Sequence, residues 1–291
     1  MTKKRKFIQI FVVAVLLGGV VLYFAFVKEQ GYQKIEYQIE YQSDTLFLEE
    51  DLRQYVHSNC PKVIGKLSDS VNLTEFERIV DKYPYLESAD VVNNFGVLVI
   101  KALQHKILCK VYTSDGSQYF LSATGKMVPA KKRSAGRVII VNGTISDKYN
   151  PNIDLSKWDS LKTKSGSKIK EYPPLYTVWK ILQYIENDHF WKAEIGQIYV
   201  NSKKEIELVP VVGNHTVIFG KLDPYIDPQI DIETKFANLK DIYTNGFKIK
   251  KWDKYKSVNL KFGMEHVPCQ TREYNFNSYI EQKNETKKEK K

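Results

Sequence analysis

The sequence is poor in cysteine, and its cysteines do not have the spacing of a metal site or a disulfide framework. Cys60, Cys109 and Cys269 lie far apart in the 291-residue chain. A small, odd number of widely separated cysteines argues against a disulfide-stapled scaffold and against a structural zinc site. A Cys60–Cys109 bridge is an open alternative, but burial of the thiols among apolar side chains is the simpler expectation. We therefore expect neither a metal nor a cofactor.

Motifs of catalysis and nucleotide binding are also absent. The chain has no G-x-G-x-x-G, G-x-x-x-x-G-K-[ST], H-E-x-x-H or G-x-S-x-G, and its five histidines are isolated from one another. Asp223, Asp227 and Asp231 are separated by prolines, which predicts a solvated turn rather than a carboxylate pair. A non-enzymatic protein is expected. The alternative is a membrane-anchored Ser/Lys hydrolase of signal-peptidase-like topology, whose nucleophile would be Ser43.

Positive charge is abundant but concentrated near the two ends of the chain. The formal net charge is +10, and residues 3–6 alone supply +4. Residues 283–291 hold five lysines and two glutamates, and so supply +3. The residues between them are too nearly neutral to follow a phosphate backbone, so no nucleic acid partner is expected, nor a small-molecule substrate. The composition of residues 264–291 predicts a lysine-rich disordered tail.

One long apolar run, residues 7–27, contains no charged side chain. As a helix it would measure ~31 Å, about the thickness of the hydrocarbon core of a bilayer. Four basic side chains directly precede it, and by the positive-inside rule they orient the span: Lys3, Lys4, Arg5 and Lys6. The sequence predicts a single-pass protein of the inner (plasma) membrane, with a cytoplasmic tail over residues 1–6. A linker over residues 28–34 would lead to the extracytoplasmic bulk of the chain.

The residues after the linker have the pattern of a small α+β domain over 35–105. Ile35, Tyr37 and Ile39 alternate with polar residues, which is typical of a half-buried strand. The expected elements are a strand over 35–42, a helix over 48–59, a helix starting after Asn72, and strands over 87–93 and 97–103. This order packs two helices on one face of a small sheet and leaves a sheet edge available to another strand.

The second part, residues 106–263, reads mainly as strands with two helices. Strands are expected over 106–112, 118–121, 137–141, 195–201, 205–209, 216–220 and 255–262, and helices over 175–187 and 232–243. The polar, lysine-rich residues 145–172 are interpreted as an inserted loop. The predicted fold class is therefore α+β, with a transmembrane helix, a small β-α-α-β-β domain and a mainly β extracytoplasmic domain.

The order of these features resembles that of the FtsQ/DivIB family of bacterial cell-division proteins. The residues that carry the resemblance are Pro84-Tyr85-Leu86 before an apolar strand, Gly125 and Pro129 around a turn, the apolar run Val138–Gly143, and Val258–Phe262. The chain departs from the family at Gln104, where an acidic residue is common, at Ile107, where a proline is usual, and at Ser122, where an aspartate is expected. The resemblance implies that residues 35–105 are a POTRA domain and residues 106–263 a β domain.

The resemblance also implies a non-enzymatic scaffold of the divisome, located at the septum, that binds FtsL- and FtsB-like single-span proteins. In such a scaffold the edge of the last β-domain strand gives the contact, through its backbone groups and alternate side chains. The residues carried over as partner-binding are Ser257, Val258, Asn259, Leu260, Lys261, Phe262 and Gly263. The other interpretation of Val258, Leu260 and Phe262 is that they face the core. An envelope POTRA adaptor for protein assembly or secretion is a further alternative function.

Overall fold

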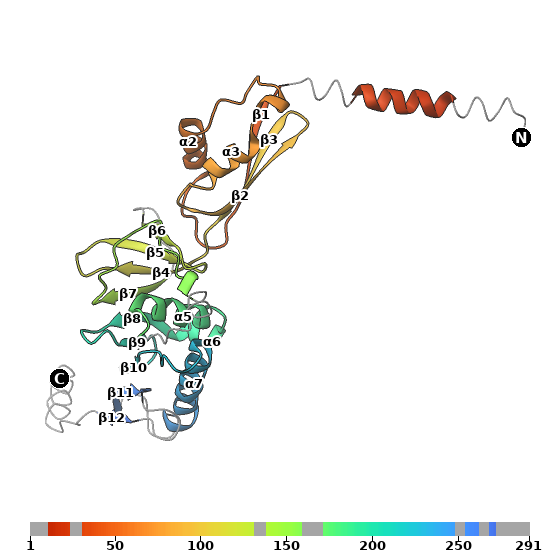
Figure 1. Ribbon diagram of the computed structural model, residues 1–291. Helices are drawn as coiled ribbons and strands as arrows, with labels where there is room; N and C mark the ends of the chain where they lie inside the picture. The colour runs from red at the N-terminus through yellow and green to blue at the C-terminus, as the bar shows by residue number, and fades with distance from the viewer. Residues whose placement is uncertain are drawn as a thin grey trace, which may run out of the picture. The chain divides into compact units, whose positions relative to one another are not determined.

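The computed structural model describes residues 11–23, 31–130, 138–158, 171–247, 254–261 and 268–271. The chain divides into two compact units, residues 1–107 with 128–137 and residues 108–127 with 138–291. The first contains a three-stranded sheet, and a nine-stranded mixed sheet belongs mainly to the second (Figure 1). The predicted α+β class is confirmed. The finer domain boundaries, including the one between residues 105 and 106, stay predictions.

The predicted membrane span is described only in part. Residues 11–23 form a helix, while 7–10 and 24–27 lie outside the described residues. Among the described residues, the structure contains no helix with the length and apolar character needed to cross a membrane. Lys3, Lys4, Arg5 and Lys6 also lie outside the described part, so their membrane-orienting role stays a prediction.

The first unit has the predicted order of elements. These are β1 (Lys34–Glu40), α2 (Glu49–Asn59), the 3-10 turn η1 (Ser68–Ser70), α3 (Leu73–Val80), β2 (Leu86–Asn94) and β3 (Val97–Gln104). The sheet order is β1-β3-β2, with β1 parallel and β2 antiparallel to β3. The Asn72 side chain accepts a hydrogen bond from the Glu75 N–H at 3.1 Å, as expected of an N-cap. Helix α2 ends at Asn59, two residues before Pro61.

The second unit is built on a sheet of order β12-β11-β10-β9-β8-β7-β4-β5-β6. Its strands are β4 (Ile107–Tyr112), β5 (Gln118–Ser122), β6 (Met127–Pro129), β7 (Ile139–Gly143), β8 (Ile195–Val200), β9 (Ile206–Pro210), β10 (Thr216–Gly220), β11 (Tyr255–Asn259) and β12 (Cys269–Thr271). Two of these, β6 and β12, were not predicted. Strand β12 lies within residues 264–291, whose disorder stays a prediction because the structure describes only 268–271 of them. The three residues of β12 are too few and too polar to carry a strand pattern.

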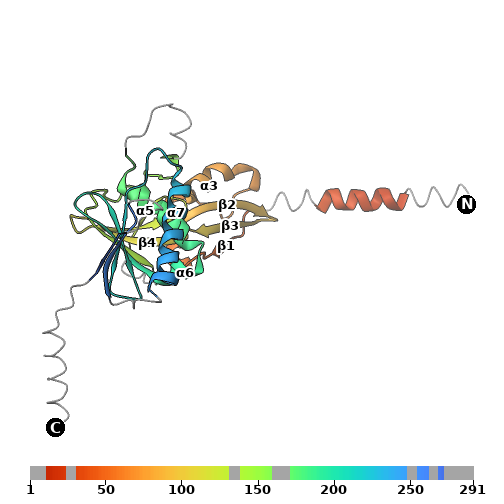
Figure 2. The same cartoon turned by 90° about the horizontal axis from the view of Figure 1, so that it is seen from below.

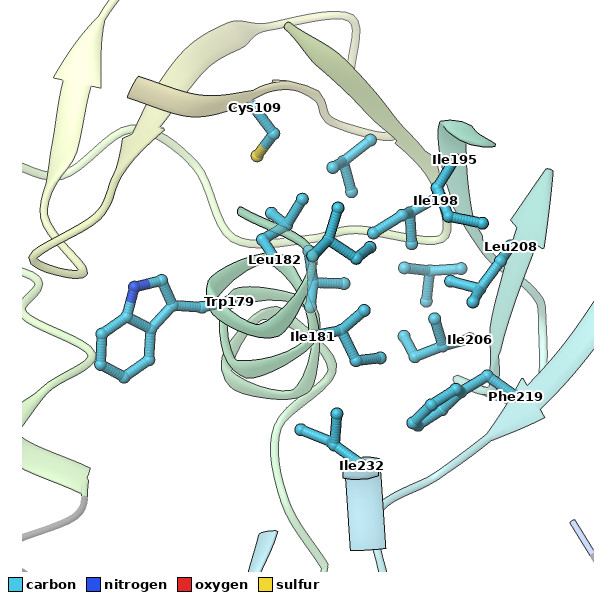
Figure 3. Packing of buried hydrophobic residues seen from close by; sticks show 14 of the residues in the cluster. Cys109, Trp179, Ile181, Leu182, Ile195, Ile198, Ile206, Leu208, Phe219 and Ile232 are labelled. Atoms are coloured by element: carbon cyan, nitrogen blue, oxygen red, sulfur yellow. The ribbon is translucent and has the colours of Figure 1, made fainter. Parts of the chain in front are cut away.

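Three helices lie together against the large sheet: α5 (Pro174–Glu186), the unpredicted α6 (His189–Glu194) and α7 (Pro228–Asp241), which continues into the π-helical turn η2 (Ile242–Gly246) (Figures 1 and 2). The core forms around α5. Figure 3 shows Ile181 and Leu182 pointing toward the strands that carry Ile198 and Leu208, while Trp179 points away from them. On that other side the Trp179 indole N–H donates to the Ala123 carbonyl oxygen at 3.2 Å.

Two predictions for the connecting segments are corrected by this core. The stretch 145–172 is not simply a polar loop, because Ile145, Leu155 and Tyr172 are buried in the core around α5. Residues 159–170 of this stretch lie outside the described part of the chain. The three aspartates are not all in a solvated turn: Asp227 is the N-cap of α7, and Asp231 is buried.

Candidate interface at the end of the large sheet

The predicted partner-binding residues lie near one end of the nine-stranded sheet, but their strand is not the outermost one. Strand β11 pairs with β10 in parallel and with β12 in antiparallel orientation, so that Ser257 lies opposite both Thr216 and Gln270. Strand β11 is therefore not the outermost strand of the described sheet, while the partner-binding role of Ser257–Gly263 stays a prediction. The pairing with β12 could not be read from the sequence, because it depends on a three-residue strand.

The backbone beyond the paired part of β11 is also used within the sheet. The Asn259 N–H donates to the Pro268 carbonyl oxygen at 3.0 Å, and the Leu260 N–H donates to Ile218 at 2.9 Å. On the outer side of β12, no further strand is found among the described residues. As far as the described residues extend, the outer side of β12, Cys269–Thr271, is therefore the edge at this end of the sheet.

The side chains of this region confirm the core-facing interpretation for two residues. Val258 is 0% exposed and Leu260 is 3% exposed, and both belong to the core around α5. Phe262 and Gly263 lie outside the described residues. Lys261 turns to the surface, where its Nζ lies 3.0 Å from Glu205 Oε1. This hydrogen bond holds the pKa of the Glu205 carboxyl below its usual value.

A cleft of about 770 Å³, which we call the α7 cleft, opens beside Leu260 and Lys261. Its walls come from residues 221–226, from α7 and from Glu205. Three apolar side chains around it are exposed: Tyr225 at 82%, Ile226 at 41% and Ile230 at 58%. Exposed apolar groups gathered at one cleft are typical of a protein-binding surface.

A buried ion pair fixes the loop that carries two of these apolar side chains, Tyr225 and Ile226. Lys235 Nζ lies 3.0 Å from Asp231 Oδ2 and also donates to the Lys221 carbonyl oxygen at 2.8 Å. Asp231 Oδ2 in turn accepts the Asp223 N–H at 3.0 Å, and the Lys235 ammonium lies 4.7 Å from the centroid of the Phe219 ring. Each charge is therefore held by several partners, which a buried ion pair requires. The rim of the α7 cleft is held in place from within.

Ser43, the residue considered as a nucleophile, lies beside backbone groups, and the non-enzymatic character of the protein stays a prediction. The Ser43 hydroxyl lies 3.5 Å from both the His105 carbonyl oxygen and the Ile107 nitrogen, which are backbone groups. In the part of the chain that the structure describes, no three His, Cys, Asp or Glu side chains are placed to hold a metal ion. Two features at this end of the large sheet, the β12 edge and the α7 cleft, were missed by sequence reasoning. Exposed apolar residues next to Pro224 and Pro228 were the available signal for the cleft.

Comparison with known proteins supports the resemblance at the level of a related family. The family model described as FtsQ/DivIB, C-terminal related, matches residues 107–269, which include β4 to β11 and end at the first residue of β12. A comparison with curated proteins gives no match to this sequence. The match spans more than half of the chain, and the chain therefore belongs to the FtsQ/DivIB, C-terminal related family.

Proposed function

We propose that this protein is a non-enzymatic, membrane-anchored scaffold of bacterial cell division that binds single-span partners of the FtsL and FtsB kind at the septum. Its relation to the FtsQ/DivIB C-terminal domain supports a division-related role. The apolar run over residues 7–27 supports the anchor, and the β-α-α-β-β order of the first unit supports a POTRA-like module. The bulk of the chain would then lie outside the cytoplasm.

The observation that carries the proposal is the end of the large sheet. There the outer side of β12 faces no described strand, and β11, its inner neighbour, runs on to the α7 cleft at Leu260 and Lys261. A partner segment that adds to β12 would gain backbone hydrogen bonds. Its apolar side chains would pack against Tyr225, Ile226 and Ile230, which are exposed in the chain by itself. Affinity would come from the backbone and specificity from the cleft.

Photocrosslinking in dividing cells tests this proposal. A photoreactive phenylalanine analogue is placed singly at Gln270, Thr271 and Tyr225, and at Tyr112 of β4 as a control position in the same sheet. We expect discrete adducts with small single-span division proteins from the first three positions and none from Tyr112. Adducts of the same identity and yield from Tyr112 would contradict the assignment, as would their absence from all positions in a folded, expressed protein.

A complementation test separates the cleft from the edge. Ile230→Asp places a charge on the rim of the α7 cleft, and Val211→Asp places the same charge at a side chain of similar exposure outside it, 61% against 58%. We expect Ile230→Asp to impair septum formation and to lose the crosslinks from Tyr225, while Val211→Asp supports division. Equal behaviour of the two variants would exclude the cleft as the partner surface.

A further inference from the structure

The two edges of the small sheet in the first unit are protected very differently. On the outer side of β2, the Ala89 N–H donates to the Asp81 carboxylate at 2.5 Å and the Val91 N–H donates to Glu77 at 3.0 Å. Both acceptors come from α3 or its C-terminal cap. This edge is closed by intramolecular carboxylates, which is a common way to prevent a sheet from pairing with another chain.

Among the residues that the structure describes, the other edge, β1, is closed only at its beginning. The Tyr32 N–H donates to the Lys66 carbonyl oxygen at 2.9 Å, and the Gly65 N–H donates back to Tyr32 at 2.8 Å. The Gln33 N–H instead points inward and donates to Gly96 at 2.8 Å. Because backbone groups alternate in a parallel pair, Lys34, Glu36 and Gln38 turn theirs outward. In the described part of the chain, no backbone partner is recorded for these outward groups.

A groove of about 1000 Å³, which we call the β1 groove, lies beside this open edge. Ile35 and Tyr37 line it from β1, and residues 50–57 of α2 and 60–64 line it from the other side. Its apolar floor consists of Val56, Val63 and Phe76, which are buried in the unit. No residue of β1 itself is fully buried. Within the described residues, this edge therefore has both backbone groups without a strand partner and space for the side chains of an added strand.

The charge of the β1 groove is predominantly positive. Lys34, Arg53 and Lys62 line it together with a single carboxylate, Glu50. The Arg53 guanidinium lies 4.5 Å from the centroid of the Tyr37 ring. Arg53 and Lys34 also form ion pairs with Glu49 and Glu36, but all four side chains are substantially exposed and such pairs are weak. A carboxylate from another chain can therefore compete for these cations.

We propose that the outer edge of β1 and the β1 groove bind an extended, acidic segment of another protein as an additional strand. The segment would pair with the backbone of Lys34, Glu36 and Gln38, place acidic side chains near Arg53 and Lys62, and place apolar ones over the groove floor. The chain's own lysine-rich end, residues 283–291, has the wrong charge for this site. This second docking surface belongs to the first unit and does not depend on the division role proposed for the large sheet.

Peptide selection on the purified full-length chain tests the proposal. Short random peptides displayed on phage are selected for binding, and the most enriched peptide is synthesised with a fluorescein label, beside a copy with lysine at each acidic position. Fluorescence anisotropy then gives the affinity for the wild type and three variants. We expect enriched peptides that alternate acidic and apolar residues, with no measurable binding of the lysine copy. Selection of neutral or basic peptides, or no enrichment, would overturn the proposal.

The variants distinguish strand addition from surface adhesion. Glu36→Pro removes one outward N–H, which an edge strand tolerates, and should weaken binding of the enriched peptide by about tenfold. Glu36→Ala removes the side chain but keeps the N–H, so its affinity should stay within about twofold of the wild type. Lys62→Glu should weaken binding by about fivefold. Circular dichroism and thermal unfolding check that all three variants remain folded.

Three results would contradict this assignment. Equal affinities of Glu36→Pro and Glu36→Ala would show that the edge backbone is not used. Concentration-dependent dimerisation of the chain that Glu36→Pro abolishes would identify a second copy, rather than an acidic segment of another protein, as the occupant. A crosslinkable version of the enriched peptide, mapped by mass spectrometry, should label residues 34–37 or 53–64. Labelling confined to residues 216–271 would also refute the proposal.

Discussion

The two sheets differ in how deeply their strands are buried. In the large sheet, Ile198 and Val200 of β8 and Ile206 and Leu208 of β9 are all 0% exposed. In the small sheet only β3 has mostly buried side chains, and β1 has none that are fully buried. Because burial of apolar surface dominates stability, we expect the strands of the large sheet to contribute more to the folding free energy than β1 does. The small sheet instead ends in β1, an edge strand whose side chains are all at least partly exposed.

Removal of a large core side chain should produce the largest loss of stability. The loss should be confined to the second unit. Trp191 is among the largest fully buried side chains, and it packs 5.0 Å from Phe236 between ring centroids. Trp191→Ala should lower the free energy of unfolding by about 4 kcal/mol because it leaves a large cavity. Hydrogen exchange measured by mass spectrometry should show faster exchange in residues 174–260 and unchanged exchange in residues 34–104.

The neighbouring Phe190 gives a matched control for this prediction. Its side chain is 44% exposed, so Phe190→Ala should cost about 1 kcal/mol or less. If Trp191→Ala accelerated exchange equally in both sheets, the two units would unfold together. The two sheets could then not be assigned different stabilities.

Disruption of the buried ion pair beneath the α7 cleft should produce the next largest loss of stability. Asp231→Ala leaves the buried Lys235 ammonium without its carboxylate and should cost about 3 kcal/mol in urea unfolding. The double variant Asp231→Leu/Lys235→Met removes both charges, and so should recover most of this loss. If the double variant were as unstable as the single one, the hydrogen bonds to Lys221 and Asp223, rather than the charge pairing, would hold the loop.

The regular elements of both units could be predicted from local patterns. The alternation of Ile35, Tyr37 and Ile39 identified β1, and the helical spacing of Leu175, Val178 and Leu182 identified α5. The elements missed, β6, α6 and β12, have three to six residues, too few to establish a period. Their formation depends on neighbouring strands and helices that lie elsewhere in the sequence.

The candidate site was only partly predictable for a related reason. The sequence indicated that Ser257 and Val258 belong to a late strand, and they do. It could not indicate which strand is outermost, because that depends on pairing between distant segments. Likewise, three aspartates among prolines predict an exposed turn. Asp231 is buried because Lys235, one helical turn later, also faces inward. A charge pattern in the sequence does not distinguish an aspartate in an exposed turn from one in a buried ion pair.

The hydrogen bonds that close the edge of β2 should contribute less to the free energy of unfolding than the cores do. Their contribution should still be large enough to measure. Glu77→Ala removes the carboxylate that accepts the Val91 N–H, and should cost about 1.5 kcal/mol because that partly buried donor loses its partner. The exposed Thr74, on the same helix, is the control: Thr74→Ala should stay within about 0.5 kcal/mol of the wild type. If the first unit in the Glu77→Ala variant also began to self-associate, the α3 carboxylates would be acting as edge protection.

The smallest expected effect is the pH dependence of the ion pair between Lys261 and Glu205. The folded state lowers the pKa of Glu205 from its usual 4.5, so the stabilisation is fully present above that pH and is lost as pH falls through the folded-state pKa. Glu205→Gln should therefore cost about 0.5 kcal/mol at neutral pH, with the difference from the wild type vanishing in acid. A double-mutant cycle with Lys261→Gln isolates the pair. A loss that persisted in acid would mean that Glu205 acts through Asn201, whose amide lies 3.3 Å away, rather than through charge.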